Sequence, residues 1–498
     1  MKKLLCATLE DISAKTVEVE VSFVRSLPSF SIVGLAQTSI QESKERIKSA
    51  LSSIDFKFPP QKLVVNLSPS DIKKQGTHFD LPIALLIALY KEEVKFEDMV
   101  VFGELGLDGK LKDTNSIFPI ILSLSSSFSD KTILIPKDSF EKISKIPNLK
   151  LLTADTLKEA IDIVKEKKKP TKSNSLLEYK HIMIDNKRYY YHEDFREDFK
   201  DIKGQTRALR ASLIASAGFH NILYEGSPGC GKSMCAKRLR YILPPMSLEE
   251  ILDLAKIDAL TNKEIDFTPS RAFRSPHHTA SRASIFGGSN KSIGEVALAN
   301  NGEFFADELP HFSKSVLESL REPLQDHKIL VSRVKDKIEY DTKFIFVSAQ
   351  NPCPCGNLFS KTKECRCSEL EIKRYKNRIS SPILDRIELY VQMEEVDLGE
   401  KSSTTSKKMF KEVLKAFKMQ KQRGQTELNG KLSDSDIEKY CILDDETQNI
   451  LNHAIMRYEL SQRGINNIKK VSRTVADLAE SKDIKKEHLL EALSFRMK

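Results

Sequence analysis

The sequence lacks the long apolar run that a membrane-spanning helix needs. No stretch reaches the roughly eighteen consecutive apolar residues that such a helix requires. The apolar stretch near the start is too short for a signal peptide and soon meets charged residues. No repeat of fixed period is present either. These absences predict a cytoplasmic protein without a membrane partner.

The chain also has little excess charge of either sign and few cysteines for its length. Its 498 residues include 79 basic and 70 acidic side chains, which gives a formal net charge of +9. This excess permits nucleic-acid binding but does not argue for it, because lysine-rich surfaces are common. The eight cysteines do not form a disulfide framework in so long an intracellular chain. Four are scattered, and four lie close together between residues 353 and 367.

The pattern of apolar residues divides the chain into parts of an α/β fold, within the roughly two to four domains that the length predicts. Residues 1–165 predict a mixed α/β domain. Residues 166–194 predict a linker, because Lys165–Ser175 is charged and polar without an apolar face; a basic nucleic-acid arm is the alternative. Residues 195–397 predict a second α/β domain, and 398–498 have helical periodicity. In the first domain we expect strands at 16–23, 62–67 and 132–135, a helix at 81–90 and a turn at 105–110.

Residues 226–233 read Gly-Ser-Pro-Gly-Cys-Gly-Lys-Ser, which is a complete phosphate loop. A short strand precedes it and a helix follows it, so the helix N-terminus favours an anion; a chance glycine-rich turn is the alternative. Lys232 is predicted to reach the β- and γ-phosphates, and Ser233 to place its hydroxyl on Mg²⁺. The predicted cofactors are therefore ATP and Mg²⁺. The predicted nucleotide-binding residues are Gly226, Ser227, Pro228, Gly229, Cys230, Gly231, Lys232 and Ser233, with Asp307 as a further ligand.

An apolar strand at residues 302–306 runs into two acidic residues, Asp307 and Glu308. Phosphoryl-transfer enzymes need a metal ligand and a residue that positions the attacking water. We expect Asp307 to hold Mg²⁺ through water and Glu308 to polarise the attacking water. A strand that ends in a surface acidic pair is the alternative, but it is less favoured downstream of a phosphate loop.

Three further side chains are predicted to take part in hydrolysis. Asn351 ends an apolar strand and is expected to hold the water beside the γ-phosphate. Arg386 follows an apolar helix end; in a ring, such an arginine reaches the neighbouring subunit's γ-phosphate, where its fixed charge stabilises the transition state. A salt bridge with Asp385 or Glu388 is the alternative. Arg473 is predicted to touch the phosphates from the C-terminal domain, with an exposed helix arginine as the alternative.

Together these elements follow the AAA+ pattern, and the sequence resembles the magnesium-chelatase-like ComM/YifB family of bacterial AAA+ proteins. The resemblance covers nearly the whole chain. Besides the phosphate loop, it is carried by Asp201–Gln205, Arg274–Thr279, Gly294–Gly302, Asn351–Gly356, Ser381–Arg386 and Val471–Leu478. In this class, the loop at Asp201–Gln205 lies over adenine. The sequence departs from the family pattern at Ala306, where a bulkier residue is usual, and in residues 287–294, which lack the expected glycines and prolines.

The resemblance implies an N-terminal domain with a Lon-protease-like, ribosomal S5-type fold, a AAA+ core with a parallel sheet, and a C-terminal helical lid. It also implies a hexameric ring with ATP-driven helicase or branch-migration activity, linked to DNA processing in natural transformation. The alternative is a magnesium-chelatase-like or protein-remodelling AAA+ ATPase that does not act on DNA. A protease and a nucleotide-switched scaffold are less favoured.

The N-terminal domain lacks the catalytic pair of the Lon proteases that it resembles. Residues 71–82 resemble the segment with the catalytic serine, but Thr-His-Phe stands near the nucleophile position, at 77–79. Residues 103–118 resemble the segment with the catalytic lysine, but their lysines precede its expected place. Serine–lysine catalysis needs both groups within hydrogen-bond reach. We therefore predict a non-proteolytic domain, with His78 as a structural histidine and Thr77 as a disfavoured nucleophile.

Four cysteines form two Cys-x-Cys pairs, Cys353 with Cys355 and Cys365 with Cys367. Four thiolates in one short loop can close a tetrahedral Zn²⁺ site, although about two to four residues usually lie within each pair. Cysteines without metal and an iron–sulfur cluster are the alternatives. No open coordination position is implied, so the predicted zinc is structural. Because the loop follows Asn351, the metal is expected to brace the strand end that senses the γ-phosphate.

Two segments of the second domain are predicted to contact DNA. Arg274–Ser284 combines basic and small residues, and Lys328–Glu339 is typical of a hairpin with basic residues at its tip. In ring motors, such loops follow the phosphates through charge; packing between subunits is the alternative. A metal site at His277 and His278 is disfavoured, because neighbouring side chains in a helix or strand point in different directions. The predicted partners are single-stranded or branched DNA and further copies of this chain in a hexamer.

Overall fold

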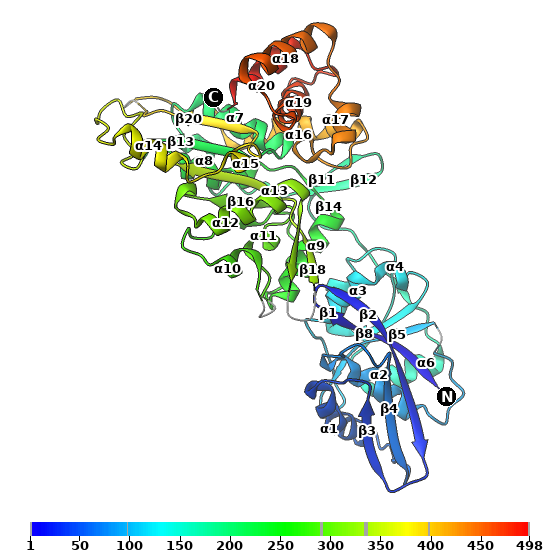
Figure 1. Cartoon of the computed structure of the whole chain (residues 1–498). Coiled ribbons are helices and arrows are strands. Elements are labelled where there is room, and N and C mark those ends of the chain that lie inside the picture. Colours follow the sequence, from blue (N-terminus) through cyan, green and yellow to red (C-terminus); the bar gives the residue numbers. More distant parts are fainter. Residues whose placement is uncertain (1, 97, 289–291, 333–336, 397–398, 497–498) are drawn as a thin grey trace. The chain divides into compact units, whose positions relative to one another are not determined.

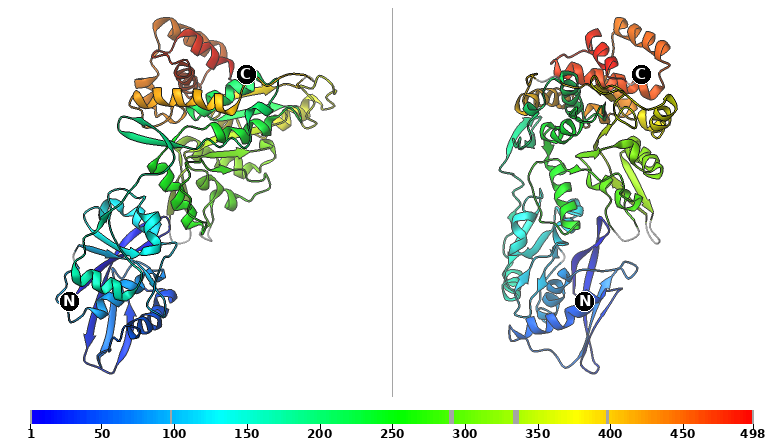
Figure 2. Two further views of the ribbon diagram at one scale, coloured as in Figure 1. Left: turned by 180° about the vertical axis from the view of Figure 1, so that it is seen from behind. Right: turned by 90° about the vertical axis from the view of Figure 1, so that its left-hand side faces the viewer.

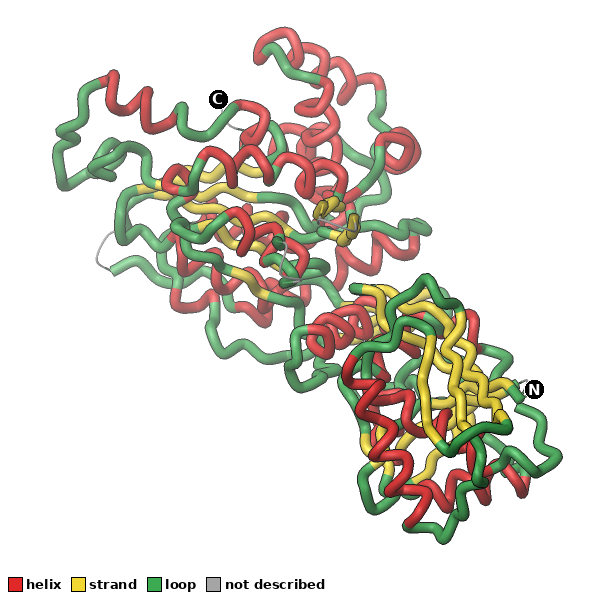
Figure 3. Tube along the Cα trace, turned by 60° about the horizontal axis from the view of Figure 1, so that its bottom comes forward, coloured by secondary structure: helices red, strands yellow, loops and turns green. Residues whose placement is uncertain are grey.

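The computed structural model describes residues 2–96, 98–288, 292–332, 337–396 and 399–496. The chain divides into two compact units (Figure 1). The first unit comprises Met1–Glu178 and Leu252–Phe267, and the second comprises Tyr179–Ile251 and Thr268–Lys498. Each unit has its own main sheet, which Figure 3 shows as a separate group of strands. No helix in the described part of the chain has both the length and the apolar character that crossing a membrane requires.

A mixed eight-stranded sheet organises the first unit. Its strands are β1 (Lys3–Glu10), β2 (Ser13–Val24), β3 (Ser29–Val33), β4 (Lys62–Ser68), β5 (Met99–Val101), β8 (Thr132–Pro136), β9 (Lys150–Ala154) and β10 (Thr171–Lys172), in the order β10-β9-β8-β5-β1-β2-β4-β3. The strand predicted at 16–23 is confirmed as β2, where Val17, Val19 and Val21 are buried and alternate with less buried residues. The strands predicted at 62–67 and 132–135 are confirmed as β4 and β8.

Helices pack beside this sheet. They are α1 (Thr38–Ser52), α2 (Asp80–Ala88), α3 (Ile117–Ser123), α4 (Ser125–Phe128), α5 (Phe140–Ile143) and α6 (Leu157–Glu166). α2 confirms the apolar helix predicted at 81–90, and it is buried along nearly its whole length against β1 and β2. The predicted turn at 105–110 joins a short hairpin of β6 (Glu104–Leu105) and β7 (Leu111–Lys112). The mixed α/β character of this region is confirmed, and its likeness to Lon proteases stays a prediction.

A parallel five-stranded sheet organises the second unit. Its strands are β13 (Ile222–Gly226), β15 (Phe273–Arg274), β16 (Glu303–Ala306), β19 (Ile345–Gln350) and β20 (Leu389–Met393), in the order β15-β16-β19-β13-β20. All neighbours run parallel. Every residue of β13, β16 and β19 is buried, as expected for strands covered on both faces. The predicted parallel-sheet core is confirmed, and all its strands end at one carboxyl edge, where such sheets bind ligands.

Helices and hairpins surround this parallel sheet. The helices are α7 (Thr206–Gly218), α8 (Lys232–Leu239), α9 (Leu248–Leu260), α10 (Arg282–Phe286), α11 (Glu295–Leu298), α12 (Lys314–Ser319), α13 (Arg321–Asp326), α14 (Glu369–Lys376) and α15 (Ser381–Leu384). β17 (Lys328–Ser332) and β18 (Lys337–Asp341) pair as an antiparallel hairpin. This hairpin occupies the segment in which the sequence predicts one.

The C-terminal part of the chain is helical, as predicted. Its helices are α16 (Ser406–Gln422), α17 (Asp434–Tyr440), α18 (Asp445–Tyr458), α19 (Gln462–Leu478) and α20 (Lys486–Ser494). They gather as one group, orange to red, in both views of Figure 2. The stripe of Ile468, Val471 and Val475 on α19 is buried, and α19 packs on α7, α16 and α20. These contacts attach the helical region to the parallel-sheet core.

Part of the segment predicted as a linker is folded. β11 (Lys180–Ile184) and β12 (Lys187–Tyr191) form an antiparallel hairpin, which pairs with β14 (Met246–Ser247). Tyr190 is only 2% exposed, and the rings of Tyr189 and Tyr191 contact phenylalanines of α16. These aromatic side chains have a partner surface that the charged residues before them lack. The structure also assigns Leu252–Phe267 to the first unit, whereas the sequence pattern includes it in residues 195–397.

Candidate nucleotide-binding site

The phosphate loop joins β13 to α8 at the carboxyl edge of the parallel sheet. β13 ends at Gly226 and α8 begins at Lys232. Gly229 and Gly231 have φ values of +85° and +97°, in the left-handed region that is costly for residues with a side chain. A Cβ at Gly229 would have no atom within 4 Å. The backbone conformation, rather than lack of space, therefore favours glycine in this turn.

Lys232 and Asn351, both predicted to act on the γ-phosphate, are in contact. The Nζ atom of Lys232 donates to Oδ1 of Asn351 at 3.1 Å and to the carbonyl oxygens of Gly226 and Ser227 at 2.6 and 2.9 Å. Asn351 directly follows β19, which pairs with β13. Burial lowers the pKa of Lys232. Because an ammonium group prefers an anionic acceptor, these neutral acceptors are contacts that phosphate oxygens can replace.

Ser233 and Asp307 form an oxygen-rich corner beside the loop. The Oγ atom of Ser233 donates to Oδ2 of Asp307 at 3.0 Å. Asp307 follows β16, and the parallel pairing of β16, β19 and β13 brings it level with the start of α8. Hydroxyl and carboxylate oxygens suit Mg²⁺, which usually also keeps water and substrate phosphates as ligands. The donor set of these two residues therefore fits the predicted metal.

Glu308 lies at the same edge, with a left-handed φ of +52°. Its N–H donates to Oδ1 of Asp307 at 3.0 Å. Its carboxylate reaches into a more open position, with 55% of the side chain exposed, and Oε2 lies 3.4 Å from Nδ1 of His278. The contact with His278 is a feature that sequence reasoning missed.

Gln205 ties the predicted adenine loop to the phosphate loop. Its Nε2 atom donates to the carbonyl oxygen of Cys230 at 3.1 Å and to that of Glu394, just beyond β20, at 2.6 Å. Nearby, the guanidinium of Arg238 on α8 pairs with Asp201 at 2.9 Å. The segment at 201–205 is thus fastened to both ends of the site, and its contact with adenine stays a prediction.

The four clustered cysteines lie with their sulfur atoms together. The Sγ atom of Cys353 is 3.5 Å from that of Cys355 and 3.7 Å from that of Cys365, and Cys355 and Cys365 are 3.6 Å apart. With Cys367, all four sulfurs lie within 4.8 Å of one another. Tetrahedral bonds of about 2.3 Å to Zn²⁺ place sulfurs about 3.8 Å apart. The number and spacing of the sulfurs therefore fit a tetrahedral thiolate site.

This cysteine loop packs directly on the phosphate loop. Gly356 follows Cys355 with a φ of +80°, and a Cβ built there would lie 2.6 Å from Cδ of Pro228. A side chain at this position is therefore excluded by space as well as by backbone conformation. The contact joins the candidate metal site to the nucleotide-binding turn.

Arg386 lies at the opposite, amino edge of the sheet. It precedes β20, and its carbonyl oxygen accepts a hydrogen bond from Asn221, just before β13. Its guanidinium donates to the carbonyl oxygen of Pro382 and to Oε1 of Gln325, and among the described contacts it has no ion pair with Asp385 or Glu388. Burial lowers the pKa of Arg386, and so does the charge of nearby Arg463.

Arg463, near the start of α19, is a second arginine at this amino edge. It donates to the same Oε1 atom of Gln325 at 3.0 Å. Arg386, Arg463, Lys431 and Lys470 line one cavity of about 600 Å³. Sequence reasoning missed Arg463; the available signal was a second arginine on the same helix as Arg473.

Arg473 does not lie with the phosphate loop in this chain. It is 2% exposed, and its guanidinium donates to the carbonyl oxygens of Ser481 and Lys482 at 2.7 and 2.8 Å. It also pairs at 3.1 Å with Asp477, which in turn pairs with Arg423. The contacts described for its side chain thus lie within the C-terminal helices, and neither an exposed arginine nor a phosphate contact is seen. Its role at the phosphates stays a prediction.

In the first unit, the two Lon-like segments meet through different residues from those of a serine–lysine pair. The Nε2–H of buried His78 donates to the carbonyl oxygen of Ala7 at 2.8 Å, and Oγ of Ser116 donates to Nδ1 at 3.0 Å. Burial lowers the pKa of His78 to about 4, so the ring is neutral at pH 7. Thr77 donates to the carboxylate of Glu104. His78 therefore has the contacts of a structural histidine.

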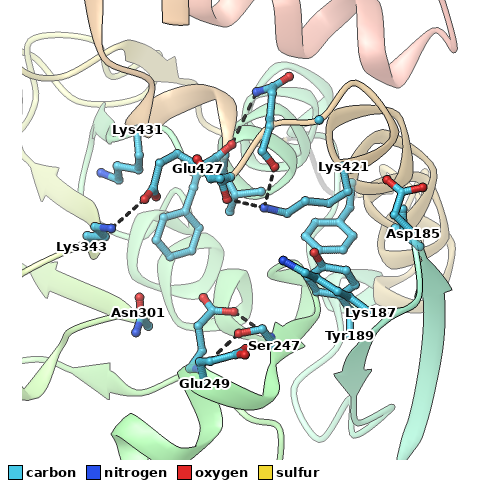
Figure 4. A pocket seen from close by; sticks show the side chains of 18 of the residues that line it. Asp185, Lys187, Tyr189, Ser247, Glu249, Asn301, Lys343, Lys421, Glu427 and Lys431 are labelled. Atoms are coloured by element: carbon cyan, nitrogen blue, oxygen red, sulfur yellow. Dashed lines mark hydrogen bonds and ion pairs between the residues drawn. The ribbon is translucent and has the colours of Figure 1, made fainter. Parts of the chain in front are cut away.

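A separate cavity of about 390 Å³ lies beside the amino ends of β16 and β19 (Figure 4). Its charged side chains are largely paired with one another. Lys343 pairs with Glu427 at 2.7 Å, and Arg271 pairs with Glu250 at 3.0 Å. Lys421 donates to main-chain carbonyl oxygens of the loop that follows α16. This mutual neutralisation leaves the cavity without a clear preference for a ligand of either sign.

The segments predicted to contact DNA are partly described. Residues 275–284 are mostly exposed, and Arg282 donates to Ser319 at 2.9 Å. In the hairpin of β17 and β18, Lys328 pairs with Glu339 at 2.6 Å. The basic tip at 333–336 and residues 289–291 of the glycine-containing loop lie outside the described residues. Contact of either segment with DNA stays a prediction.

Comparison with known families finds matches along most of the chain. The family described as "Magnesium chelatase, subunit ChlI" matches residues 198–401, and "Subunit ChlI of Mg-chelatase" matches residues 18–139. "Magnesium chelatase, subunit ChlI C-terminal" matches residues 403–496. Together the matches include both sheets and the C-terminal helices.

Individual relatives match over nearly the full length. Competence protein ComM from Haemophilus influenzae is 35% identical over 97% of this chain and 95% of its own length. Proteins named YifB from Escherichia coli and Salmonella typhimurium, both described as uncharacterized, are each 33% identical over 97% of this chain and 95% of their own length.

Proposed function

Because the chain belongs to the ComM/YifB family of magnesium-chelatase-like AAA+ proteins, we propose that it is an ATP hydrolase that works as a hexameric DNA motor. The observation that carries the ATPase proposal is the convergence of two pairs, Lys232 with Asn351 and Ser233 with Asp307, at one edge of the sheet. Four polar side chains from three separate segments meet there beside a phosphate loop. A surface acidic pair would not need such an arrangement.

In this proposal, each residue at the carboxyl edge has a separate task. The N–H groups of the phosphate loop and Lys232 bind the phosphates. Ser233 and Asp307 hold Mg²⁺, which supplies charge that neutralises the transferring phosphoryl group. Glu308 accepts the proton of the attacking water, and Asn351 orients that water. The lid and Gln205 keep the adenine loop and the phosphate loop together.

The arginines at the amino edge support action between subunits. Arg386 and Arg463 lie at the far end of the strands from the phosphate loop of the same chain. A neighbouring copy in a ring can present its γ-phosphate to this edge. We propose that Arg386 stabilises the transition state there, and that Arg463 stands beside it as a second cation.

DNA as the substrate is supported by the printed name of the ComM relative, which describes a competence protein. The exposed segment at 275–284 and the hairpin of β17 and β18 are the proposed DNA contacts. A second function, magnesium chelation or protein remodelling, is favoured by the descriptions of the matching families, which name magnesium chelatase. A cytoplasmic location also remains part of the proposal.

We further propose that Cys353, Cys355, Cys365 and Cys367 hold a structural Zn²⁺. The support is the spacing of their sulfurs, which is close to that of a tetrahedral thiolate site. A closed four-thiolate site leaves no position for substrate, so the metal's task is to hold the loop that follows Asn351.

The deciding experiment measures ATP hydrolysis with no DNA, with single-stranded DNA and with forked DNA, at moderate and high salt. We expect DNA to raise the rate, high salt to reduce that effect because phosphate contacts are ionic, and Glu308→Gln to abolish hydrolysis while ATP still binds. A substantial rate that no DNA changes would favour the second function.

A further inference from the structure

The carboxylate proposed to activate water is held by a residue of the segment proposed to contact DNA. Nδ1 of His278 lies 3.4 Å from Oε2 of Glu308. His278 belongs to the segment between β15 and α10, whereas Glu308 follows β16. β15 and β16 are neighbouring parallel strands, so both side chains leave the same edge of the sheet.

Among the contacts that the structure describes, His278 is the polar partner of the Glu308 carboxylate. The Glu308 side chain is 55% exposed and the His278 side chain 27%. A carboxylate that is this exposed is otherwise free to change rotamer. The direction in which it points therefore depends on His278.

His278 itself is held by a row of rings. Its ring centroid lies 4.2 Å from that of His277 and 5.8 Å from that of His311, and the ring of His311 lies 6.1 Å from that of Tyr375. His277 has a different partner, since its Nδ1 atom contacts Oγ1 of Thr279 at 2.8 Å. The two adjacent histidines thus differ in one respect that matters here: His278 contacts Glu308, and His277 does not.

Resting on the proposed ATPase function, we propose that His278 is a positioning residue that restrains Glu308 and connects it to the exposed segment at 275–284. A donor bound to a carboxylate oxygen competes with the attacking water for that oxygen, which lowers the activity of the base. When a polyanion binds Arg282 and its neighbours and shifts the segment, the contact opens and Glu308 is released. Substrate binding outside the nucleotide site then raises hydrolysis through one side-chain contact.

The first test measures hydrolysis without DNA. We expect His278→Ala to raise kcat about two- to fivefold, the size expected from losing one partly exposed ionic contact, with KM for ATP unchanged. His277→Ala is the matched control, because it removes the adjacent ring without removing a Glu308 contact, and it should leave kcat unchanged. His278→Asn places an amide N–H near the position of Nδ1 and should restore the lower rate. Thermal melting of each variant verifies that it is folded.

The results that overturn this proposal are an unchanged or lower kcat in a folded His278→Ala variant, or an equal rise in the His277→Ala control. The second test adds single-stranded DNA, which should stimulate the wild type more than His278→Ala, so that the ratio of stimulated to basal rate falls toward one in the variant. If DNA stimulates none of the proteins, the proposed DNA substrate fails, and the basal comparison still decides the role of His278. If the wild type binds a fluorescent ATP analogue but hydrolyses no ATP, the ATPase proposal and this one both fail.

Discussion

The two edges of the parallel sheet in the second unit have opposite chemistry. At the carboxyl edge, Lys232 meets Asn351 and Ser233 meets Asp307, so cation, amide, hydroxyl and carboxylate lie in contact. At the amino edge, Arg386 and Arg463 share one neutral acceptor on Gln325 and line a cavity. β13 has 5 residues, and at about 3.3 Å per residue it separates the edges by about 16 Å. A single chain therefore carries the two halves of the proposed reaction too far apart to combine, and a neighbouring copy has to join them.

The largest expected effect comes from separating the two edges by mutation. Arg386→Ala should lower kcat about a thousandfold, in the range found for arginines that act between subunits. ATP affinity should stay within about twofold, because the binding residues lie at the other edge. Steady-state kinetics and equilibrium binding of a fluorescent ATP analogue measure the two quantities.

Mixing two inactive variants sharpens this prediction. Rings assembled from Arg386→Ala and Glu308→Gln subunits contain some sites in which Glu308 and the neighbour's Arg386 are both intact. The mixture should therefore hydrolyse ATP faster than either variant alone. A mixture that stays as inactive as its parts, in assembled rings, would mean that Arg386 does not act on a neighbour.

The second effect concerns the carboxyl edge alone. Lys232→Ala should weaken ATP binding about 10- to 100-fold, because it removes charged hydrogen bonds to the phosphates. Lys237→Ala, on the exposed face of the same helix, is the matched control and should bind ATP normally. Isothermal titration with a non-hydrolysable analogue measures the affinity. Equal binding by the Lys232 variant would contradict the assignment of this edge to the phosphates.

The carboxyl edge was easier to predict from the sequence than the amino edge, for a physical reason. A phosphate loop and a strand ending in Asp307 and Glu308 are local patterns, and parallel pairing brings strand ends together wherever the strands lie in the sequence. The meeting of Arg386 with Arg463 depends instead on how α19 packs on the core, which no local pattern encodes. For the same reason the sequence selected Arg473 on that helix, although its buried contacts differ from those of Arg463. The folded hairpin of β11 and β12 was missed because its aromatic residues find partners on α16, far away in the sequence.

A third prediction tests whether the cysteine loop supports the carboxyl edge. Cys365→Ser should reduce bound zinc from one ion per chain to nearly none, because three thiolates hold the ion less well than four. ATP hydrolysis should fall about tenfold, since the loop touches Pro228 and follows Asn351. Metal analysis and ATPase rates are measured on the same samples, with Cys6→Ala in the first unit as the control. A metal-free variant with full activity would separate the cysteine loop from catalysis.

The smallest effect on hydrolysis is expected for Arg473, whose change should act on stability. Its partner Asp477 is fully buried, and breaking a buried pair costs about 3 kcal/mol of unfolding free energy or more. Arg473→Ala should therefore lower the Tm, with kcat at 25 °C changed less than about twofold. Arg473→Lys should recover part of the loss, because it keeps the charge but not the forked geometry.

The pH dependence of that loss distinguishes a buried ion pair from a phosphate contact. Burial raises the pKa of Asp477, and the charges of Arg473 and Arg423 lower it. Without Arg473 the folded-state pKa rises further above the unfolded value of about 3.9. The folded variant then binds a proton that the unfolded chain releases, so its stability falls as the pH rises through the folded pKa. The Tm difference between wild type and Arg473→Ala should accordingly be small near pH 5 and larger at pH 8. A Tm difference independent of pH, together with a large loss of kcat, would move Arg473 from the buried cluster to the phosphates.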